Sequence, residues 1–275
     1  MLTMPEGPEI RRARDELAGI LEDQPVHKVF FAFDRLQAYQ AELVQQRIVS
    51  VEARGKAMLI HFDNGYTIYS HNQLYGRWYV ATDNKCPDIK RQLRLSIHVD
   101  TGSAFLYSAT DILVVQTQQL ATHPYLRKLG LELLSPDTTE SMVQERLIEY
   151  RRSRRCLMSL LQDQSVLSGM GNYLCCEVLH AVGLHPENRL CDLDDTQLQM
   201  LAHYCLALTV QSYETGGITN TLTRAEQMQT QGLEFEDYRF LVYRREGEAC
   251  YRCGGEIVKG TFCGRMGYCC LGCQV

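Results

Sequence analysis

The 275-residue sequence predicts an α+β protein made of more than one domain. Three observations predict this fold class. Short β-type runs with turn residues fill the first half, helical periodicity begins near residue 135, and two Cys-x-x-Cys pairs lie close to the C-terminus. We expect three domains, comprising residues 1–133, 134–236 and 237–275.

The first half is predicted to start with a helix over residues 8–21 and to continue in strands. Pro8 suits a first helical position, and apolar residues recur on one helical face: Ile10, Ala13, Leu17, Ile20 and Leu21. β-type runs follow at 29–33, 48–53, 57–62, 66–69, 78–80 and 93–99. Hairpin turns at 63–65 and 100–102 join some of these runs. Many short strands of this kind predict a sandwich or a barrel-like domain.

The second half is predicted to be helical up to about residue 238, where β character returns. Gly130 and Pro136 mark a linker before the first helix. A first helical segment is expected to open at residues 138–140, and further helical segments are expected at 153–165, 172–182 and 194–214. Gly169 and Gly171 form a tight turn between the second and third segments.

The C-terminal cysteines predict one structural zinc site. Sixteen residues, 254–269, separate two Cys-x-x-Cys pairs, which suits four thiolates around one tetrahedral ion: Cys250, Cys253, Cys270 and Cys273. Such a site has no open coordination position for a reacting water, so the metal would stabilise the local fold and take no part in catalysis. Cys263 and Cys269 are competing ligands, but only Cys270 completes a two-residue knuckle. The remaining eight cysteines are expected to be buried small hydrophobes or bystanders.

Composition excludes few classes of function. A net charge of -5 argues weakly against a nucleic-acid partner, although only the charges that face phosphates decide binding. The arginines between residues 151 and 155 form a basic cluster, or simply a solvated face. No apolar run is long enough to span a membrane, and the first residues do not resemble a secretory signal. We therefore expect a cytoplasmic protein with reduced thiols.

The segment Pro5-Glu6-Gly7-Pro8-Glu9-Ile10 admits two interpretations. It is a helix start, with prolines that set φ and acids that complement the dipole. Alternatively, a mature chain that begins at Pro5 presents a free secondary amine, which can attack a sugar C1′ and form a Schiff base. An α-amine has a pKa near ~8, so much of it is unprotonated at neutral pH. The adjacent Glu6 would then serve as general acid or base.

Taken together, this N-terminal segment, the Gly171-Asn172-Tyr173 turn and the four-cysteine module with its Arg265 resemble the formamidopyrimidine-DNA glycosylase/endonuclease VIII family. The likeness runs from Met4 to Gln274. It implies an N-terminal β-sandwich with an N-terminal helix, a helix–two-turn–helix domain and a C-terminal zinc-ribbon β-hairpin. It also implies a bifunctional DNA glycosylase/AP lyase of base excision repair, with double-stranded DNA as partner.

The resemblance assigns catalytic roles to four residues. Pro5 resembles the Schiff-base nucleophile and Glu6 the proton donor. Lys56 resembles the lysine that assists β-elimination, although taken alone it is an exposed hairpin lysine. Arg265 resembles the finger arginine that grips phosphates and assists δ-elimination, a task that suits its planar fork; taken alone it is a solvated loop residue.

The resemblance also predicts DNA contacts. Gln73, Leu74 and Tyr75 resemble the wedge that fills the space left by an extruded nucleotide; the alternative is a strand end packed into the core. Asn172 lies at a helix N-terminus, where it would hold a phosphate or act as a plain N-cap. Lys128 occupies the position where the family has an arginine. It keeps the positive charge but lacks the planar guanidinium that binds phosphate with two hydrogen bonds. The wedge and Gly7 favour the endonuclease VIII branch, and hence oxidised pyrimidines as substrates.

One departure concerns the first residues. In the family, proline follows the initiator Met, whereas here Met1-Leu2-Thr3 precede Met4-Pro5. We expect translation to start at Met4. If Pro5 is not the mature N-terminus, the alternative function is a non-catalytic binder of damaged or abasic DNA. We further expect a monomer that associates with the bacterial nucleoid through DNA and does not contact a membrane.

Overall fold

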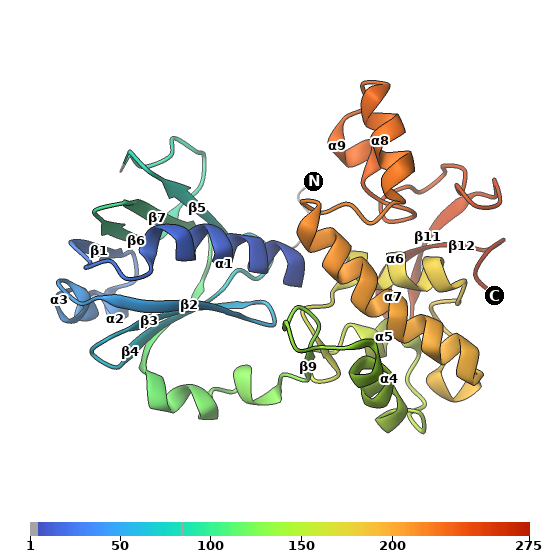
Figure 1. The fold of residues 1–275 in the computed structure, drawn as a ribbon, viewed down its shortest axis with the longest axis horizontal. Helices are drawn as coiled ribbons and strands as arrows, with labels where there is room; N and C mark the ends of the chain where they lie inside the picture. The colour runs from blue at the N-terminus through green and yellow to red at the C-terminus, as the bar shows by residue number, and fades with distance from the viewer. Residues whose placement is uncertain (1–4, 84) are drawn as a thin grey trace. The chain divides into compact units, whose positions relative to one another are not determined.

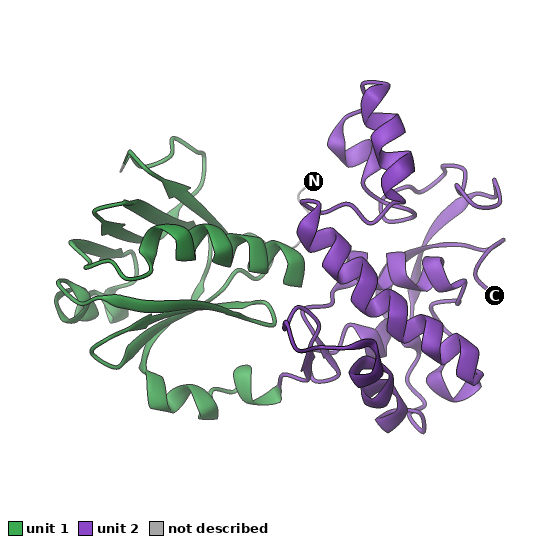
Figure 2. Cartoon of the chain, viewed as in Figure 1, with its two compact units in different colours: residues 1–128 green, residues 129–275 purple. Residues whose placement is uncertain are grey.

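The computed structural model describes residues 5–83 and 85–275, and the expected start at Met4 lies outside them. The chain forms two compact units, residues 1–128 and residues 129–275 (Figure 2). The helices of the second half and the cysteine module belong to the same unit. Each unit has a buried apolar core of its own.

The first unit is a β-sandwich, as predicted. Its strands are β1 Lys28–Phe31, β2 Ile48–Arg54, β3 Ala57–Phe62, β4 Tyr66–His71, β5 Arg77–Ala81, β6 Leu93–Val99, β7 Gly102–Tyr107 and β8 Asp111–Gln116. They form two antiparallel four-stranded sheets, in the orders β1-β6-β7-β5 and β2-β3-β4-β8. Side chains from both sheets share one apolar core, which is how a sandwich is stabilised.

Helix α1, Gly7–Leu21, packs against this sandwich (Figure 1). Its apolar stripe places Ile10, Leu17 and Leu21 in the shared core. The helix begins one residue earlier than Pro8 predicted. The other short helical segments of the unit are α2 Asp34–Gln37, α3 Tyr39–Leu43, and the 3-10 turns η1 Thr117–Thr122 and η2 Leu126–Lys128.

The second unit contains helices and two small β elements. The helices are α4 Glu140–Glu149, α5 Leu157–Leu161, α6 Asn172–Val182, α7 Asp195–Glu214, α8 Leu222–Thr230 and α9 Phe235–Tyr238, with a 3-10 turn η3 at Leu190–Asp192. The strands are β9 Leu131–Glu132, β10 Leu167–Ser168, β11 Ile257–Phe262 and β12 Arg265–Cys270. β11 and β12 form the expected hairpin.

The hairpin is part of the helical core. Ile257, Phe262 and Cys270 are buried in the same apolar cluster as residues of α5, α6 and α7. An added Cβ at Gly267 would meet Met158 Cε of α5 at 2.5 Å, so the strand passes very close to that helix. The hairpin therefore takes its position from the helices it packs on.

Two predictions for this unit are wrong. The helix expected at 153–165 is limited to Leu157–Leu161, because the Asp163 side chain accepts from the Ser165 N–H at 2.9 Å and turns the chain away. The return to β structure at residue 238 is also wrong. Backbone N–H groups of residues 241–243 donate to a buried carboxylate instead of to a strand.

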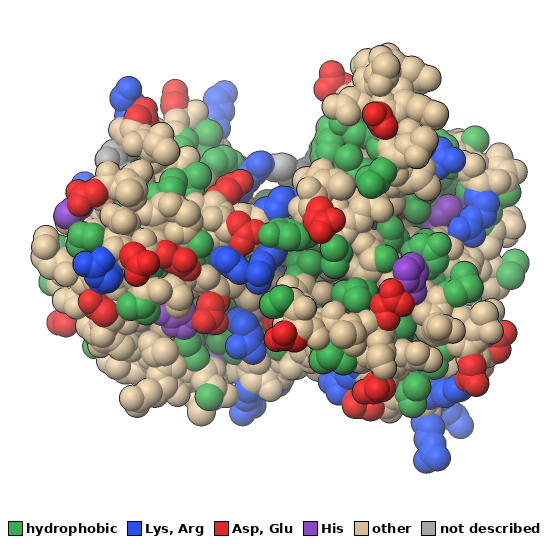
Figure 3. All heavy atoms as spheres, in the orientation of Figure 1, with side chains coloured by type: hydrophobic (Ala, Val, Ile, Leu, Met, Phe, Trp, Pro, Cys, Tyr) green, Lys and Arg blue, Asp and Glu red, His purple; other side chains and the backbone are tan. Residues whose placement is uncertain are grey.

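The surface agrees with the low net charge. In Figure 3, Lys and Arg side chains are interspersed with Asp and Glu over the face shown, so that face has no large field of one sign. Within the described residues, no helix is both long and apolar enough to cross a membrane.

Candidate functional site

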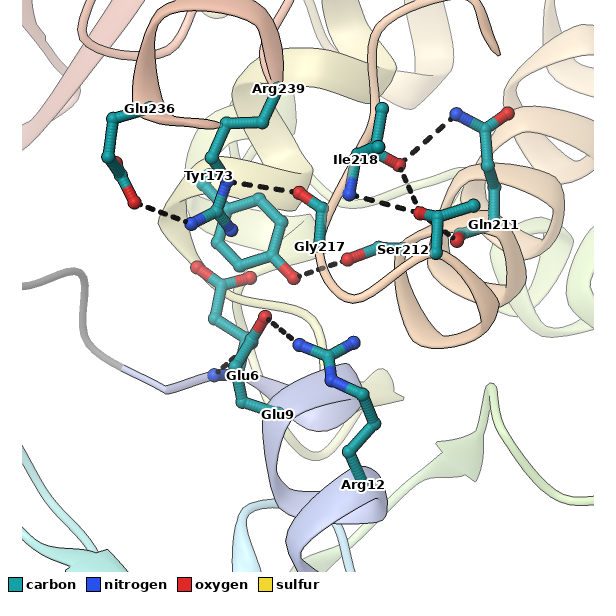
Figure 4. Close-up of polar contacts among 11 residues, drawn as sticks. Glu6, Glu9, Arg12, Tyr173, Gln211, Ser212, Gly217, Ile218, Glu236 and Arg239 are labelled. Carbon is teal, nitrogen blue, oxygen red and sulfur yellow. Dashed lines mark hydrogen bonds and ion pairs between the residues drawn. The ribbon is translucent and has the colours of Figure 1, made fainter. Parts of the chain in front are cut away.

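The N-terminus of α1 is held by reciprocal capping. Glu6 is the N-cap, and its backbone N–H donates to Glu9 Oε2 at 2.9 Å, completing a capping box (Figure 4). Arg12 in turn pairs with Glu9 at 3.0 Å. Glu6 is only 1% exposed. These contacts fix the backbone next to Pro5, which precedes the helix and is partly exposed.

Lys56 lies in a two-residue hairpin loop between β2 and β3. Gly55 supplies the left-handed conformation that the loop needs, with φ 58°. The backbone N–H of Lys56 donates to the hydroxyl of Tyr125 at 2.9 Å. No sequence pattern marks this tyrosine, because it lies in the turn between η1 and η2, 69 residues further along the chain.

The predicted wedge projects from the loop between β4 and β5. Leu74 is 55% exposed and Tyr75 is 69% exposed, so the alternative of a strand end packed into the core is wrong. The loop closes tightly, since the Gly76 N–H donates to the Asn72 carbonyl at 2.7 Å. A Cβ at residue 76 would lie 2.5 Å from that oxygen, which only glycine avoids.

Two side chains anchor the start of the wedge. His71 Nδ1 accepts from the Gln73 N–H at 3.0 Å, and Thr110 Oγ1 donates to Gln73 Oε1 at 2.6 Å. The His71 ring also packs edge-on against Tyr125, with ring centroids 5.1 Å apart. Burial lowers the pKa of His71, the Asp111 carboxylate opposes this shift, and the Lys56 ammonium adds to it. Nδ1 is therefore available as an acceptor at neutral pH.

An open pocket of about 510 Å³ joins these elements. It is lined by Tyr69, His71, Gln73, Asp111, His123 and Tyr125, among others. The Tyr69 and His123 rings are in contact, with centroids 4.2 Å apart. The Lys56 loop and Gln73, at the start of the wedge, thus contact the same group of aromatic and histidine side chains within the first unit.

In the second unit, Asn172 is the first residue of α6. Gly171 is the N-cap, so the interpretation of Asn172 as a plain N-cap is wrong. The Cys176 thiol lies 3.9 Å from Asn172 Oδ1, a weak contact at most. Asn172 therefore lies beside the N–H groups that open an eleven-residue helix, the kind of position that binds phosphate. Lys128 is exposed at the end of the first unit.

A buried carboxylate in the same helix carries no sequence signal. Glu177 is 0% exposed and accepts from Thr219 Oγ1 at 2.6 Å. It also accepts from the backbone N–H groups of Leu241, Val242 and Tyr243 at 2.6 to 2.8 Å. Burial raises the pKa of Glu177, and these four donors oppose that shift. Glu177 thus attaches the segment that leads to the cysteine module to α6.

Arg239 is a second buried charged residue with no sequence signal for its role. Its Nε donates to the Gly217 carbonyl at 3.0 Å, and its Nη1 pairs with Glu236 at 3.0 Å (Figure 4). Its guanidinium lies 4.3 Å from the Phe240 ring centroid, a cation–π contact. Tyr173 beside it bonds the Ser212 hydroxyl at 2.9 Å. Arg239 therefore ties the loop before α8 to the segment after α9.

The four knuckle cysteines converge. Their Sγ atoms all lie within 4.8 Å of one another. Cys250 and Cys273 are 3.7 Å apart at sulfur, and Cys253 and Cys270 are 3.5 Å apart. A tetrahedral Zn²⁺ with Zn–S bonds of about 2.3 Å needs sulfurs about 3.8 Å apart, so the spacing suits that ion. Cys269 is outside the cluster, and burial raises its pKa to about 11.

Neighbouring polar groups contact the sulfurs of Cys253 and Cys250. The Gly255 N–H donates to Cys253 Sγ at 3.4 Å, and this bond is the largest cause that lowers the pKa of Cys253 to about 7. His180 Nε2 of α6 lies 3.3 Å from Cys250 Sγ. The Gly255 N–H favours a thiolate at Cys253, the form that binds metal. Burial raises the pKa of Cys270 and that of Cys273, so these two thiols would give up their protons as the ion binds. The cluster can therefore hold a metal ion.

Arg265 is exposed at the tip of the β11–β12 hairpin, directly after the turn formed by Cys263 and Gly264. Cys263 is joined by a disulfide to Cys156, at the start of α5. The prediction that both are buried hydrophobes or bystanders is therefore wrong. Cys86 and Cys191 are exposed, whereas Cys175, Cys176 and Cys205 are buried as expected.

A β-sandwich, a helical unit and a four-cysteine hairpin define a class of DNA-repair fold, and comparisons with known proteins agree. The formamidopyrimidine-DNA glycosylase N-terminal domain matches residues 4–111, and the formamidopyrimidine-DNA glycosylase H2TH domain matches residues 129–224. Endonuclease 8 of Shigella flexneri serotype 5b is 44% identical over 271 residues, which cover 98% of this chain and 100% of that protein. Endonuclease 8 of Escherichia coli strain 55989 is also 44% identical, with the same coverage.

Solved structures share the fold. A complex of Lactococcus lactis formamidopyrimidine-DNA glycosylase with abasic-site DNA aligns with a TM-score of 0.80 and 24% identity, covering 98% of this chain and 99% of that one. A MutM complex with carbocyclic 8-oxo-G containing DNA aligns with a TM-score of 0.79 and 25% identity, covering 98% and 100%. The chain belongs to the formamidopyrimidine-DNA glycosylase/endonuclease 8 family, the DNA glycosylases/AP lyases of base excision repair.

Proposed function

We propose that this protein excises oxidised pyrimidines from double-stranded DNA and then cleaves the abasic strand by β,δ-elimination. The observation that carries this proposal is Pro5-Glu6 at the capped start of α1, in a chain 44% identical to Endonuclease 8 over nearly its whole length. A proline amine followed by a carboxylate held at a helix start offers a nucleophile and a proton carrier in one rigid segment.

The chemistry requires Pro5 to be the first residue. Its secondary amine would attack C1′ of the damaged nucleotide, and Glu6 would donate the proton that lets the ring open and the base leave. The resulting cationic imine acidifies the C2′ proton. Lys56, on the loop held by Tyr125, would assist the β-elimination that follows.

DNA contacts are distributed over both units. Gln73, Leu74 and Tyr75 would fill the space of the extruded nucleotide, since an exposed amide, aliphatic group and ring can lean on neighbouring bases. Asn172, Arg265 and Lys128 would bind backbone phosphates. The net negative charge of the chain does not exclude this binding, because only cationic groups near phosphates, here Arg265 and Lys128, release counterions.

Zinc is the metal that the four thiolates suit. Cys250, Cys253, Cys270 and Cys273 would hold one Zn²⁺ as a closed structural site. The ion would stabilise the local fold and would have no open coordination position for a reacting water. It holds the base of the hairpin whose tip presents Arg265.

Borohydride trapping tests the proposal. Protein that starts at Met4, and from which that Met is removed, should form a covalent adduct with duplex DNA containing thymine glycol, and Pro5→Gly should reduce the adduct at least a hundredfold. Pro136→Gly, in an exposed loop of the second unit, is the matched control and should trap normally. Intact mass should show a chain beginning at Pro5.

The alternative is a protein that binds abasic DNA without cutting it. Leu2 and Thr3 before Met4 motivate it, because an untrimmed chain has no free amine at Pro5. Salt-sensitive binding with neither nicking nor adduct, in natively expressed protein that retains Leu2 and Thr3, would establish that alternative. An adduct that survives Pro5→Gly undiminished would show that the attack does not need the secondary amine of proline.

A further inference from the structure

Cys156 and Cys263 join two parts of the second unit that lie far apart in sequence. Their sulfurs are bonded, their Cα atoms are 6.7 Å apart, and 107 residues separate them. Cys156 is the N-cap of α5, and Cys263 lies in the turn of the β11–β12 hairpin. The bond therefore attaches the hairpin tip to a helix of the core.

The two cysteines differ in exposure. Cys156 is 5% exposed, whereas Cys263 is exposed and its backbone has φ 48°. Gly264, Arg265 and Met266, which follow Cys263, are exposed as well. Exposed disulfides are the ones that reductants reach, and in reducing compartments such bonds are usually transient and redox-sensing.

The hairpin beyond the tip is held by other contacts. The Tyr268 N–H lies 3.4 Å from Cys176 Sγ of α6, and Gly267 abuts Met158 of α5. The four knuckle cysteines lie at the base of the hairpin, where the proposed zinc would hold it. Breaking the Cys156–Cys263 bond would therefore release the turn while the base of the hairpin stays in place.

We propose that Cys156 and Cys263 are a reversible oxidation site, cross-linked by a peroxide and opened by a thiol reductant, that fixes the turn presenting Arg265. The exposed Cys263 thiolate attacks the peroxide and becomes a sulfenic acid, releasing hydroxide or alkoxide. The Cys156 thiol then displaces the sulfenic oxygen as water, and the S–S bond forms. Two thiols are oxidised and one peroxide is reduced.

The functional consequence rests on the proposed role of Arg265. Arg265 follows Cys263 by two residues, so anchoring one orders the backbone of the other. The cross-linked form would present the guanidinium to phosphates in one arrangement, and the reduced form would lose part of the Arg265-dependent δ-elimination while retaining the earlier steps.

Peptide mapping tests the cross-link without any DNA. Full-length, zinc-loaded protein is reduced, treated with one to two equivalents of hydrogen peroxide, alkylated and digested. A peptide pair joined through Cys156 and Cys263 that disappears with dithiothreitol, while zinc is retained, supports the site. Both cysteines found alkylated while the knuckle cysteines are oxidised and zinc is released would overturn it.

Two further measurements test the consequence. Hydrogen exchange at residues 261–266 should slow at least threefold on oxidation, and the ratio of δ- to β-elimination product should rise at least threefold. Cys263→Ser should abolish both responses, whereas Cys191→Ser, at an exposed free cysteine of the same unit, should retain them.

Equal exchange and equal product ratios in oxidised and reduced protein would overturn the positioning role. Absence of all strand cleavage would count against the proposed function alone, because the mapping still judges the cross-link.

Discussion

The backbone N–H of Lys56 donates a 2.9 Å hydrogen bond to the hydroxyl of Tyr125, 69 residues further along the chain. The same tyrosine ring packs edge-on against His71, which anchors the wedge through the Gln73 N–H. One side chain therefore supports both the lysine loop and the base of the wedge. The Tyr125 hydroxyl contacts the Lys56 loop and the Tyr125 ring contacts His71, so a mutation that removes only the hydroxyl separates the two contacts.

Tyr125→Phe should slow β-elimination about fivefold while leaving DNA affinity unchanged. The change removes the acceptor of the Lys56 N–H, a loss of about 1 kcal/mol that loosens the loop. At about 1.4 kcal/mol for each tenfold change in rate, this loss corresponds to about a fivefold slower step. The ring contact with His71 remains. Single-turnover cleavage of a preformed abasic duplex measures the rate. Tyr39→Phe, in α3 of the same unit, is the control, and unchanged cleavage in Tyr125→Phe would remove Tyr125 from this role.

Acidic pH should destabilise the first unit through His71. Burial holds the pKa of His71 below its usual value. As pH falls below ~6.5, the unfolded chain therefore takes up a proton before the folded chain does. The stability contribution is complete above ~6.5 and is lost as pH falls through the folded pKa, with a slope of up to about 1.4 kcal/mol per pH unit. A proton on Nδ1 also removes the acceptor of the Gln73 N–H.

Urea unfolding at several pH values between 5 and 7.5 measures this slope. His71→Gln should flatten it by up to one proton, since an amide oxygen can accept from Gln73 without titrating. His27→Gln, at an exposed histidine of the same unit, is the comparison. An unchanged slope in His71→Gln would locate the acid sensitivity elsewhere.

The sandwich could be predicted from sequence because its hairpins carry local signals. Turns are predicted by Asp63-Asn64-Gly65 and by Gly55-Lys56, and the flanking runs are rich in β-branched and aromatic residues. Strand β7 lacked such a signal. Its residues are buried on both faces, so no alternation marks it as a strand.

The supporting contacts of the site could not be predicted. Glu177 occupies a helical position where an acid is ordinarily solvated, yet its four donors lie 42 to 66 residues away. The Cys156–Cys263 pairing likewise depends on how the hairpin packs on α5. Local periodicity contains no information about partners this distant. The knuckle cysteines were predictable because their spacing alone encodes a tetrahedral site.

Glu177→Gln should destabilise the second unit by about 2 to 4 kcal/mol. The amide replaces one acceptor oxygen by an NH₂ group, which would then face N–H donors in a fully buried site. The cost should appear as a lower urea midpoint for the second unit. Glu226→Gln, at an exposed acid of α8, should leave the midpoint unchanged, and an equal midpoint in Glu177→Gln would show that the donors find other partners.

Removal of the metal should unfold the hairpin and weaken the helical core with it. Ile257, Phe262 and Cys270 contribute to the same cluster as α5, α6 and α7, so loss of the hairpin exposes apolar surface on those helices. Protein as purified should contain one zinc per chain, and Cys253→Ser should reduce that content severalfold. A chelator should then lower the thermal midpoint of the second unit and leave the sandwich transition in place. Cys191→Ser is the control, since Cys191 lies outside the cluster. Full zinc content in Cys253→Ser, or a chelator effect confined to the sandwich, would contradict a structural site in this hairpin.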